Sequence, residues 1–137
     1  VIGDVVNIAS RLEGVNKAYG TQIIIEEATY RFAQKAIEVR ELDLLTVVGK
    51  NEPLRVYELV SRAGERTPEL AELHEIFAAG LTAYRAQDWA QCGKLLVNLQ
   101  QTTAPSTLYE LYAARVQTIQ GQTVDPGWDG ATNFDTK

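Results

Sequence analysis

An amphipathic helical pattern opens the chain and constrains its fold more than any other stretch. Apolar side chains recur at intervals of three and four residues, the period of one buried helical stripe, at Val5, Ile8, Leu12, Val15 and Tyr19. Asp4 stands just before this stripe, where a short acceptor side chain can cap the first free N–H groups. Gly20 follows it, in the position where glycine commonly ends a helix. The pattern therefore predicts a helix from about Val5 to Tyr19.

Two polar side chains of this predicted helix share one face. Asn7 and Arg11 are four residues apart, so they project one turn above the other. An amide and a permanent cation held together on a rigid element can orient a hydroxyl and stabilise negative charge that develops on a phosphate. From spacing alone, the alternative is that Asn7 and Arg11 lie on the solvated side of the helix, because this spacing is common.

The next forty residues mix strand and helix patterns. Residues 21–25 are a continuous, largely β-branched run, typical of a strand covered on both faces, and residues 26–34 favour a short helix. Residues 37–48 alternate apolar and polar side chains, with a phase slip at Arg40-Glu41 that a β-bulge would absorb. Glycine and proline then favour a turn at 49–53, and residues 54–60 fit the partner strand of a hairpin.

Several of these stretches together resemble one family. They are G-D-V-V-N-I-A-S-R-L-E at residues 3–13, N-K-A-Y-G-T at 16–21, I-I-x-E-A-T at 24–29 and G-K-x-E-P-L-x-V-Y-E-L at 49–59. The string resembles the C-terminal half of a class III adenylate/guanylate cyclase catalytic domain, and the resemblance covers about residues 1–60. It implies that Asn7 orients the ribose of the nucleotide and that Arg11 stabilises the transition state at the α-phosphate.

The resemblance also bears on the hairpin turn. The family usually carries Lys-Gly-Lys there, and its first lysine contacts the triphosphate, whereas this chain has Val48 at that position and keeps only Lys50. We expect Lys50 to bind substrate, with a solvated turn lysine as the alternative. A valine cannot donate a hydrogen bond to phosphate, so weaker binding of the triphosphate is expected unless Lys50 or a residue outside the chain compensates.

The family's remaining catalytic groups are expected outside this chain. The resemblance implies Mg²⁺ or Mn²⁺ held by two aspartates that would precede Val1, so no metal ligand is assigned here, and Asp4 is interpreted as a helix cap. A base-selecting residue would also precede Val1, so ATP is favoured by analogy and guanylate cyclase is the alternative. The expected partners are ATP and a second catalytic domain, because the family pairs two domains and shares each site between them.

The second half of the chain shows only helical patterns. Residues 61–67 are polar and suggest a linker, after which Thr67 and Pro68 have the form of a helix start. The stripe Leu70, Leu73, Phe77, Leu81 and Tyr84 follows.

Two more helices are predicted after this first one. Asp88 would cap a helix from Trp89 to about Gln101, and Thr107 with Glu110 has the form of a capping box for a third helix ending at Gly121. The motif Y-R-x-x-D-W at residues 84–89 resembles a tetratricopeptide-type helical hairpin. Residues 122–137 are interpreted as a tail that Trp128 anchors.

Composition excludes several classes. With 13 basic and 18 acidic residues and a net charge of −5, no nucleic-acid partner is expected. One cysteine, Cys92, and one histidine, His74, cannot form a disulfide framework or a zinc site; Cys92 is predicted to be buried and His74 to lie on a helix surface. No apolar run approaches the roughly 18 residues that span a bilayer. We expect a cytoplasmic catalytic region, taken from a longer parent protein that another segment could anchor to a membrane.

These patterns predict an α+β fold. Residues 1–60 would be the C-terminal half of a ferredoxin-like cyclase domain with exposed sheet edges, 61–67 a linker and 68–121 an all-helical extension. The expected function is part of an adenylate cyclase that is inactive alone, because the metal ligands are elsewhere. The alternative is a degenerate cyclase-like scaffold that dimerises or recruits a partner.

Overall fold

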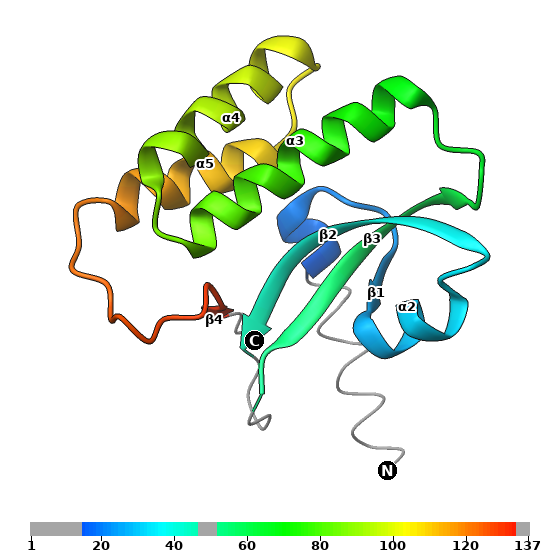
Figure 1. Cartoon of the computed structure of the whole chain (residues 1–137), viewed down its shortest axis with the longest axis horizontal. Helices are drawn as coiled ribbons and strands as arrows, with labels where there is room; N and C mark the ends of the chain where they lie inside the picture. Colours follow the sequence, from blue (N-terminus) through cyan, green and yellow to red (C-terminus); the bar gives the residue numbers. More distant parts are fainter. Residues whose placement is uncertain (1–14, 47–51, 134–137) are drawn as a thin grey trace. The chain divides into compact units, whose positions relative to one another are not determined.

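The structure is a computed structural model that describes residues 15–46 and 52–133. Contacts within the chain divide it into two compact units, one formed by Val1–Glu65 with Ala131–Lys137 and the other by Arg66–Gly130. We call these the sheet unit and the helical unit and describe each by itself. The predicted α+β class is confirmed, because strands and helices are both present (Figure 1).

Besides the helical residues 15–19, the described part of the sheet unit contains four strands and one short helix. They are β1 (Ile24–Glu26), α2 (Glu27–Ala33), β2 (Ile37–Thr46), β3 (Leu54–Arg62) and β4 (Thr132–Asn133). The strand order is β1-β3-β2-β4, in which β3 is antiparallel to both β1 and β2 and β4 is parallel to β2. The predicted hairpin is therefore confirmed. The sequence did not indicate that the tail would add a strand to it.

The predicted irregularity in the hairpin is confirmed, because the register between β2 and β3 shifts between Glu41 and Asp43, next to Arg40-Glu41. A second register shift, between Glu38 and Val39, was not predicted. In addition, β3 continues two residues into the predicted linker, because Ser61 and Arg62 pair with residues of β2.

The first strand is shorter than predicted, and the expectation that it is covered on both faces is wrong. It begins at Ile24, which is 7% exposed, whereas Ile23 is 51% exposed. Gly20 has a positive φ of 70°, and the backbone and side chain of Thr21 donate to Asn16 at 3.1 and 2.9 Å. These contacts hold the chain in a turn after the helical residues 15–19, so the extended conformation starts later.

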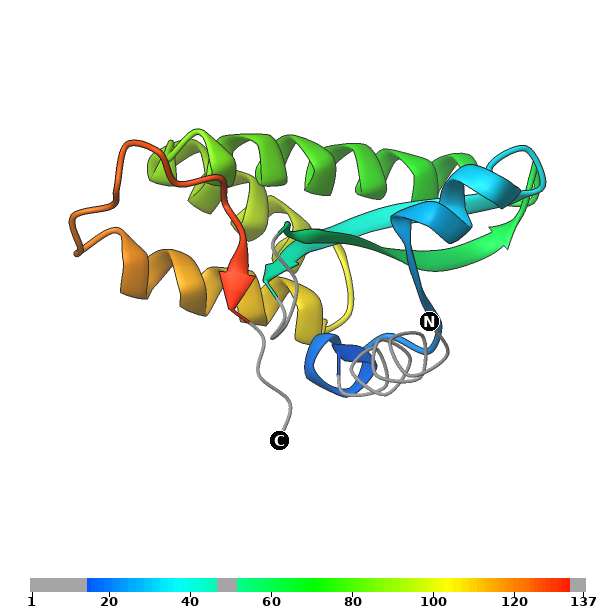
Figure 2. The ribbon, with the colours of Figure 1, turned by 90° about the horizontal axis from the view of Figure 1, so that it is seen from below.

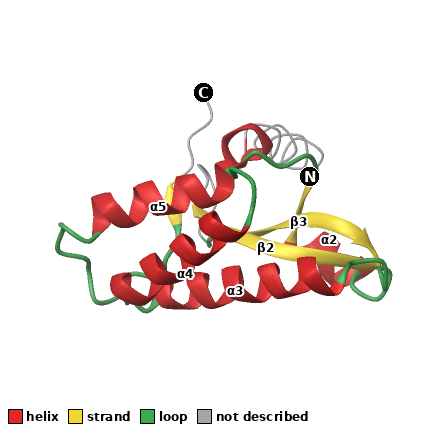
Figure 3. Ribbon diagram, turned by 90° about the horizontal axis from the view of Figure 1, so that it is seen from above, coloured by secondary structure: helices red, strands yellow, loops and turns green. Residues whose placement is uncertain are grey.

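The helical unit consists of α3 (Pro68–Arg85), α4 (Trp89–Thr102) and α5 (Thr107–Ile119), which Figure 3 shows together. The predicted caps of the first two helices are confirmed: the Thr67 hydroxyl accepts from the N–H of Leu70 at 3.2 Å and the Asp88 carboxylate from that of Gln91 at 3.2 Å. The predicted cap of α5 is wrong by one residue. Ser106 has the extended conformation of a cap and accepts from Tyr109 at 3.4 Å, whereas Thr107 is already helical.

Aromatic rings form much of the core of this unit. Phe77 of α3 meets Tyr112 of α5 edge-on with ring centroids 5.5 Å apart, and Tyr84 meets Tyr112 at 5.3 Å. The prediction that Trp128 anchors the tail is confirmed, since its ring lies 5.4 Å from Tyr84 and 5.9 Å from Trp89. Figure 2 shows that the chain between α5 and β4 contains no further helix or strand.

A glycine closes the tail against α3. Gly130 is buried and has a φ of +86°, and a Cβ placed on it would lie 2.6 Å from Cγ of Arg85. Both the backbone conformation and the close approach therefore require glycine.

The prediction that His74 lies on a helix surface is wrong. His74 is 8% exposed, and its Nδ1 is 3.3 Å from Nη1 of Arg66. The position is three residues before Phe77 and seven before Leu81, so His74 belongs to the same buried stripe of α3. The prediction that Cys92 is buried is confirmed.

Candidate functional site

The residues predicted to carry the chemistry fall outside the described part of the chain. Asn7, Arg11, Lys50 and the substituted Val48 all lie in the ranges 1–14 and 47–51. Their roles therefore stay predictions. The structure does describe the segments that flank them, which are the helical residues 15–19 and the strands β2 and β3 on either side of the turn.

A buried hydrogen bond ties the helical residues 15–19 to the sheet. The hydroxyl of Tyr19 donates to Oδ2 of Asp43 at 2.5 Å, and both residues are 1% exposed. The other oxygen of Asp43 accepts from the N–H of Leu44 at 2.8 Å. Val15, one turn before Tyr19, is also 1% exposed. This contact fixes the C-terminal end of the helix on β2, and a hydrogen bond to a carboxylate is among the stronger ones in proteins.

Sequence reasoning missed Asp43, although a signal was present. The residue interrupts an apolar run, between Leu42 and Leu44-Leu45, and a carboxylate at such a position is rarely buried without a partner. What the sequence did not show was which partner it has, since Tyr19 lies 24 residues earlier.

A second network joins α2 to the hairpin. Tyr30 packs on Tyr57 with ring centroids 4.6 Å apart, and Arg55 forms ion pairs with Glu41 and, at 3.4 Å, with Glu27. Burial, and next the negative charge of Glu41, raise the pKa of the Tyr57 hydroxyl above its usual value. This hydroxyl therefore stays protonated near neutral pH and cannot act as a base there.

Two of the three arginines in the strands of the hairpin form ion pairs with carboxylates. Besides Arg55, Arg40 contacts Glu58 across the strands, with Nη2 and Nε at 2.6 and 3.0 Å from the same oxygen. A guanidinium that is already paired is poorly suited to bind a triphosphate. The ion pairs of Arg40 and Arg55 thus support the fold of the hairpin.

Metal ions have no evident site in the described ranges 15–46 and 52–133. No group of three or more His, Cys, Asp or Glu residues there is arranged to hold one. Within the same ranges, no helix combines the length and the apolar character needed to cross a membrane.

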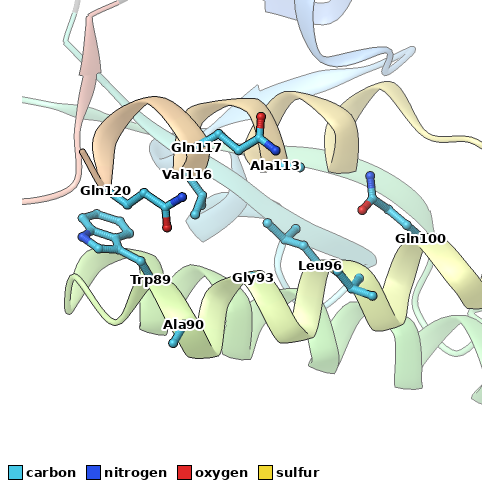
Figure 4. A pocket seen from close by; sticks show the side chains of 10 residues that line it. Trp89, Ala90, Gly93, Leu96, Gln100, Ala113, Val116, Gln117 and Gln120 are labelled. Carbon is cyan, nitrogen blue, oxygen red and sulfur yellow. The ribbon is translucent and has the colours of Figure 1, made fainter. Parts of the chain in front are cut away.

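The helical unit carries an open groove of about 380 Å³ between α4 and α5 (Figure 4). Its apolar lining comes from Trp89, Leu96, Val97 and Val116, and glutamines contribute the polar lining. No titratable side chain lines it, so it offers a binding surface rather than a catalytic one. Cys92 of α4 is 1% exposed, and burial raises the pKa of its thiol to about 11, so it is not a nucleophile at neutral pH.

Part of the chain is similar to curated adenylate cyclases. The chain is 39% identical over 59 residues to adenylate cyclase 1 of Rhizobium meliloti (strain 1021), an alignment covering 43% of this chain and 9% of that protein. It is 42% identical over 62 residues to an adenylate cyclase of Anabaena cylindrica, covering 43% and 12%. It is 38% identical over 68 residues to the terminal-differentiation specific adenylate cyclase of Dictyostelium discoideum, covering 47% and 3%.

These relatives are much longer than the matched region, since the chain spans no more than 12% of any of the three. No family model and no solved structure matches the chain. The similarity therefore supports a relationship to adenylate cyclases over slightly less than half of the chain.

Proposed function

We propose that this chain is the C-terminal part of the catalytic domain of a nucleotide cyclase that converts ATP to 3′,5′-cyclic AMP and pyrophosphate. The observation that carries the proposal is the similarity to three adenylate cyclases from three organisms, each close to 40% identical over 59 to 68 residues. The motif at residues 3–13 belongs to the same resemblance.

In this proposal Asn7 and Arg11 act on the nucleotide from the predicted opening helix. The reaction forms a bond from the ribose 3′-oxygen to the α-phosphorus, breaks the bond to pyrophosphate and releases the 3′-hydroxyl proton. The amide of Asn7 would orient the ribose, and the guanidinium of Arg11 would stabilise the charge that builds on the α-phosphate oxygens. Losing such a group costs on the order of 10²-fold in rate.

The described residues would contribute by positioning that helix. Arg11 precedes Val15 by four residues, and Asn7 precedes it by eight, so the predicted helix would carry both on the segment that leads into the helical residues 15–19. Holding Val15 and Tyr19 against the sheet through Asp43 would fix the direction in which the two side chains project.

The proposed enzyme needs parts that this chain is not expected to supply. In the family that this chain resembles, each active site takes its Mg²⁺ or Mn²⁺ ligands from one catalytic domain and the Asn7/Arg11 pair from the other. We therefore infer that a second catalytic domain supplies them and that this chain alone does not turn over ATP.

Complementation tests this proposal. The chain is mixed with a cyclase catalytic domain that keeps its metal ligands but has alanine in place of its own catalytic arginine, and cyclic AMP is measured. The mixture should be active although each component alone is not. Arg11→Ala in this chain should reduce the restored activity about 10²-fold. Arg31→Ala is the matched control, because the Arg31 side chain is 72% exposed and pairs only weakly with Glu27 at 3.3 Å.

An Arg11→Ala mixture as active as the Arg31→Ala mixture would contradict the role of Arg11. GTP is assayed in parallel, and a preference for it would change the proposed substrate.

One observation favours the alternative of a cyclase-like scaffold, namely Val48 at the usual position of a phosphate-binding lysine. In the complementation mixture, Val48→Lys should lower the KM for ATP if the site is catalytic. A scaffold would show no metal-dependent nucleotide binding with either residue.

A further inference from the structure

We propose that residues 125–133, which we call the strap, make the end of β2 depend on the state of the helical unit. In this proposal, anchoring of Trp128 in the helical unit makes β4 pair with β2, and that pairing fixes the last residue of β2. The consequence for nucleotide binding rests on the proposed function, whereas the strap itself does not. The proposal is carried by the register at the end of the hairpin, the composition of β4 and the anchoring of Trp128.

The end of β2 is paired by β4 and not by its hairpin partner. Leu45 and Leu54 form the last pair of the register between β2 and β3 within the described residues. Continuing that antiparallel register would place Pro53 opposite Thr46, and proline has no N–H to donate to the ladder. Thr46 pairs instead with Asn133 of β4, on the other side of β2. The last residue of β2 is therefore held by the strap.

The strand β4 has little tendency to form by itself. It consists of Thr132 and Asn133 and is parallel to β2, a pairing slightly less stable per residue than the antiparallel one. Asparagine is depleted in strands. Thr132 is half-buried and Asn133 is exposed, so the pairing buries little apolar surface. We infer that β4 stays on β2 because another part of the strap is held in place.

Trp128 provides that hold. Its ring lies 5.4 Å from the ring of Tyr84 and 5.9 Å from that of Trp89, measured between centroids, and aromatic pairs at such distances contribute more than the area they bury. Its N–H donates to the carbonyl of Asp125 at 2.9 Å, and the carboxylate of Asp125 accepts from the N–H of Gly127 at 2.9 Å. The strap is thus fixed to the helical unit by contacts that β4 does not share.

The link between the anchor and the strand is short. Only three residues, 129–131, separate Trp128 from Thr132. Gly130, in the middle of this link, is buried against the side chain of Arg85, so the link itself is held to α3. A short tether that spans two contacts raises the effective concentration of the second contact once the first has formed. Anchoring Trp128 should therefore favour the pairing of β4 with β2.

The strap gives the helical unit a route to the proposed active site. Thr46 directly precedes residues 47–51, which include the predicted substrate-binding Lys50. Displacing Trp128 from Tyr84 and Trp89 would free the link and remove the strand that pairs with Thr46. We therefore expect release of the strap to weaken binding of the triphosphate. Because such coupling is reciprocal, a nucleotide that orders the end of β2 would also favour the anchored strap.

Amide hydrogen exchange of the full chain, resolved to single residues by NMR, tests the strap at Leu45 and Thr46. Thr132→Pro disrupts the pairing directly, because proline cannot donate to the ladder. Trp128→Ala removes the anchor and leaves the sequence of β4 unchanged. Both variants should accelerate exchange at the end of β2 by a similar factor, about tenfold or more. Trp128→Phe keeps an aromatic ring and should restore most of the protection.

Phe32→Ala is the matched control. It also removes a large aromatic side chain, but the residue is 94% exposed, so exchange at the end of β2 should equal that of the wild type. Fluorescence of Trp89 and circular dichroism confirm that the helical unit of each variant stays folded. The strap is overturned if Thr132→Pro accelerates exchange and Trp128→Ala does not, because β4 would then pair without its anchor. It is also overturned if neither variant changes the exchange.

The complementation mixture tests the consequence for the nucleotide. Trp128→Ala and Thr132→Pro should each raise the KM for ATP about threefold or more and leave kcat nearly unchanged, since the lost interaction is one of substrate binding. Faster exchange with an unchanged KM would refute control of nucleotide binding by the strap. If the wild-type mixture makes no cyclic AMP, the proposed enzyme function fails, while the exchange rates still decide whether the strap exists.

Discussion

Replacing Tyr19 with phenylalanine tests the contact that positions the predicted catalytic helix. The substitution keeps the ring and removes only the hydroxyl that donates to Asp43 at 2.5 Å. Because both residues are 1% exposed, water cannot readily replace the lost donor. Hydrogen bonds to charged groups contribute about 1.5–3 kcal/mol, and Asp43 keeps its bond from Leu44, so Tyr19→Phe should lower the free energy of unfolding by about 2 kcal/mol.

Urea unfolding with two probes measures this effect. Both tryptophans, Trp89 and Trp128, lie in the helical unit, so their fluorescence reports that unit, whereas far-UV circular dichroism reports both units. With a urea dependence of about 2 kcal/mol per molar, the transition of the sheet unit should move to lower urea by about 1 M. The same variant should reduce the activity restored in the complementation mixture, because the helix would be held less precisely.

Tyr30→Phe is the matched control for this experiment. Tyr30 belongs to the same unit and contributes its ring to the contact with Tyr57, which phenylalanine retains. Tyr30→Phe should change the free energy of unfolding by no more than about 0.5 kcal/mol. If the two variants unfold at the same urea concentration, the buried hydrogen bond does not hold the helix on β2 and the positioning argument fails.

Three further predictions follow from local contacts. Ser106→Ala should destabilise the helical unit by about 1 kcal/mol and Thr107→Ala by much less, measured by tryptophan fluorescence in urea, because the serine caps α5. Gly130→Ala should cost at least about 2 kcal/mol in thermal unfolding, since it combines a positive φ with a Cβ clash, whereas Gly64→Ala, with a positive φ but open space, should cost about 1 kcal/mol. Burial raises the pKa of the Cys92 thiol from its ordinary value of 9.0 to about 11 in the folded chain, so the folded state keeps this proton to higher pH than the unfolded state does. The contribution of Cys92 to stability should be constant below pH 9 and decrease between pH 9 and 11, and its disulfide exchange at pH 8 should be slow until urea unfolds the chain.

Local signals in the sequence determined most of the helices. The side chains of Thr67 and Asp88 accept hydrogen bonds from N–H groups three residues later, and Pro68 is the first residue of α3. The starts of α3 and α4 could therefore be predicted from neighbouring residues. Gly20 ended the first helical segment for the same reason. The α+β class followed from the change in hydrophobic period between the two halves of the chain. The proposed site residues Asn7, Arg11 and Lys50 also came from the sequence, through a motif rather than through geometry.

The tertiary structure alone decided how distant segments pair. The sequence marked Asp43 as unusual, but only the fold showed that Tyr19 is its partner, and only the fold placed Thr132–Asn133 beside β2. His74 is buried because it faces the same side of α3 as Phe77, although its polarity suggested a surface position. The physical reason is common to these cases. Caps and turns are decided by neighbours along the chain, whereas backbone pairing between strands carries little sequence information and the burial of a polar side chain depends on what packs against it.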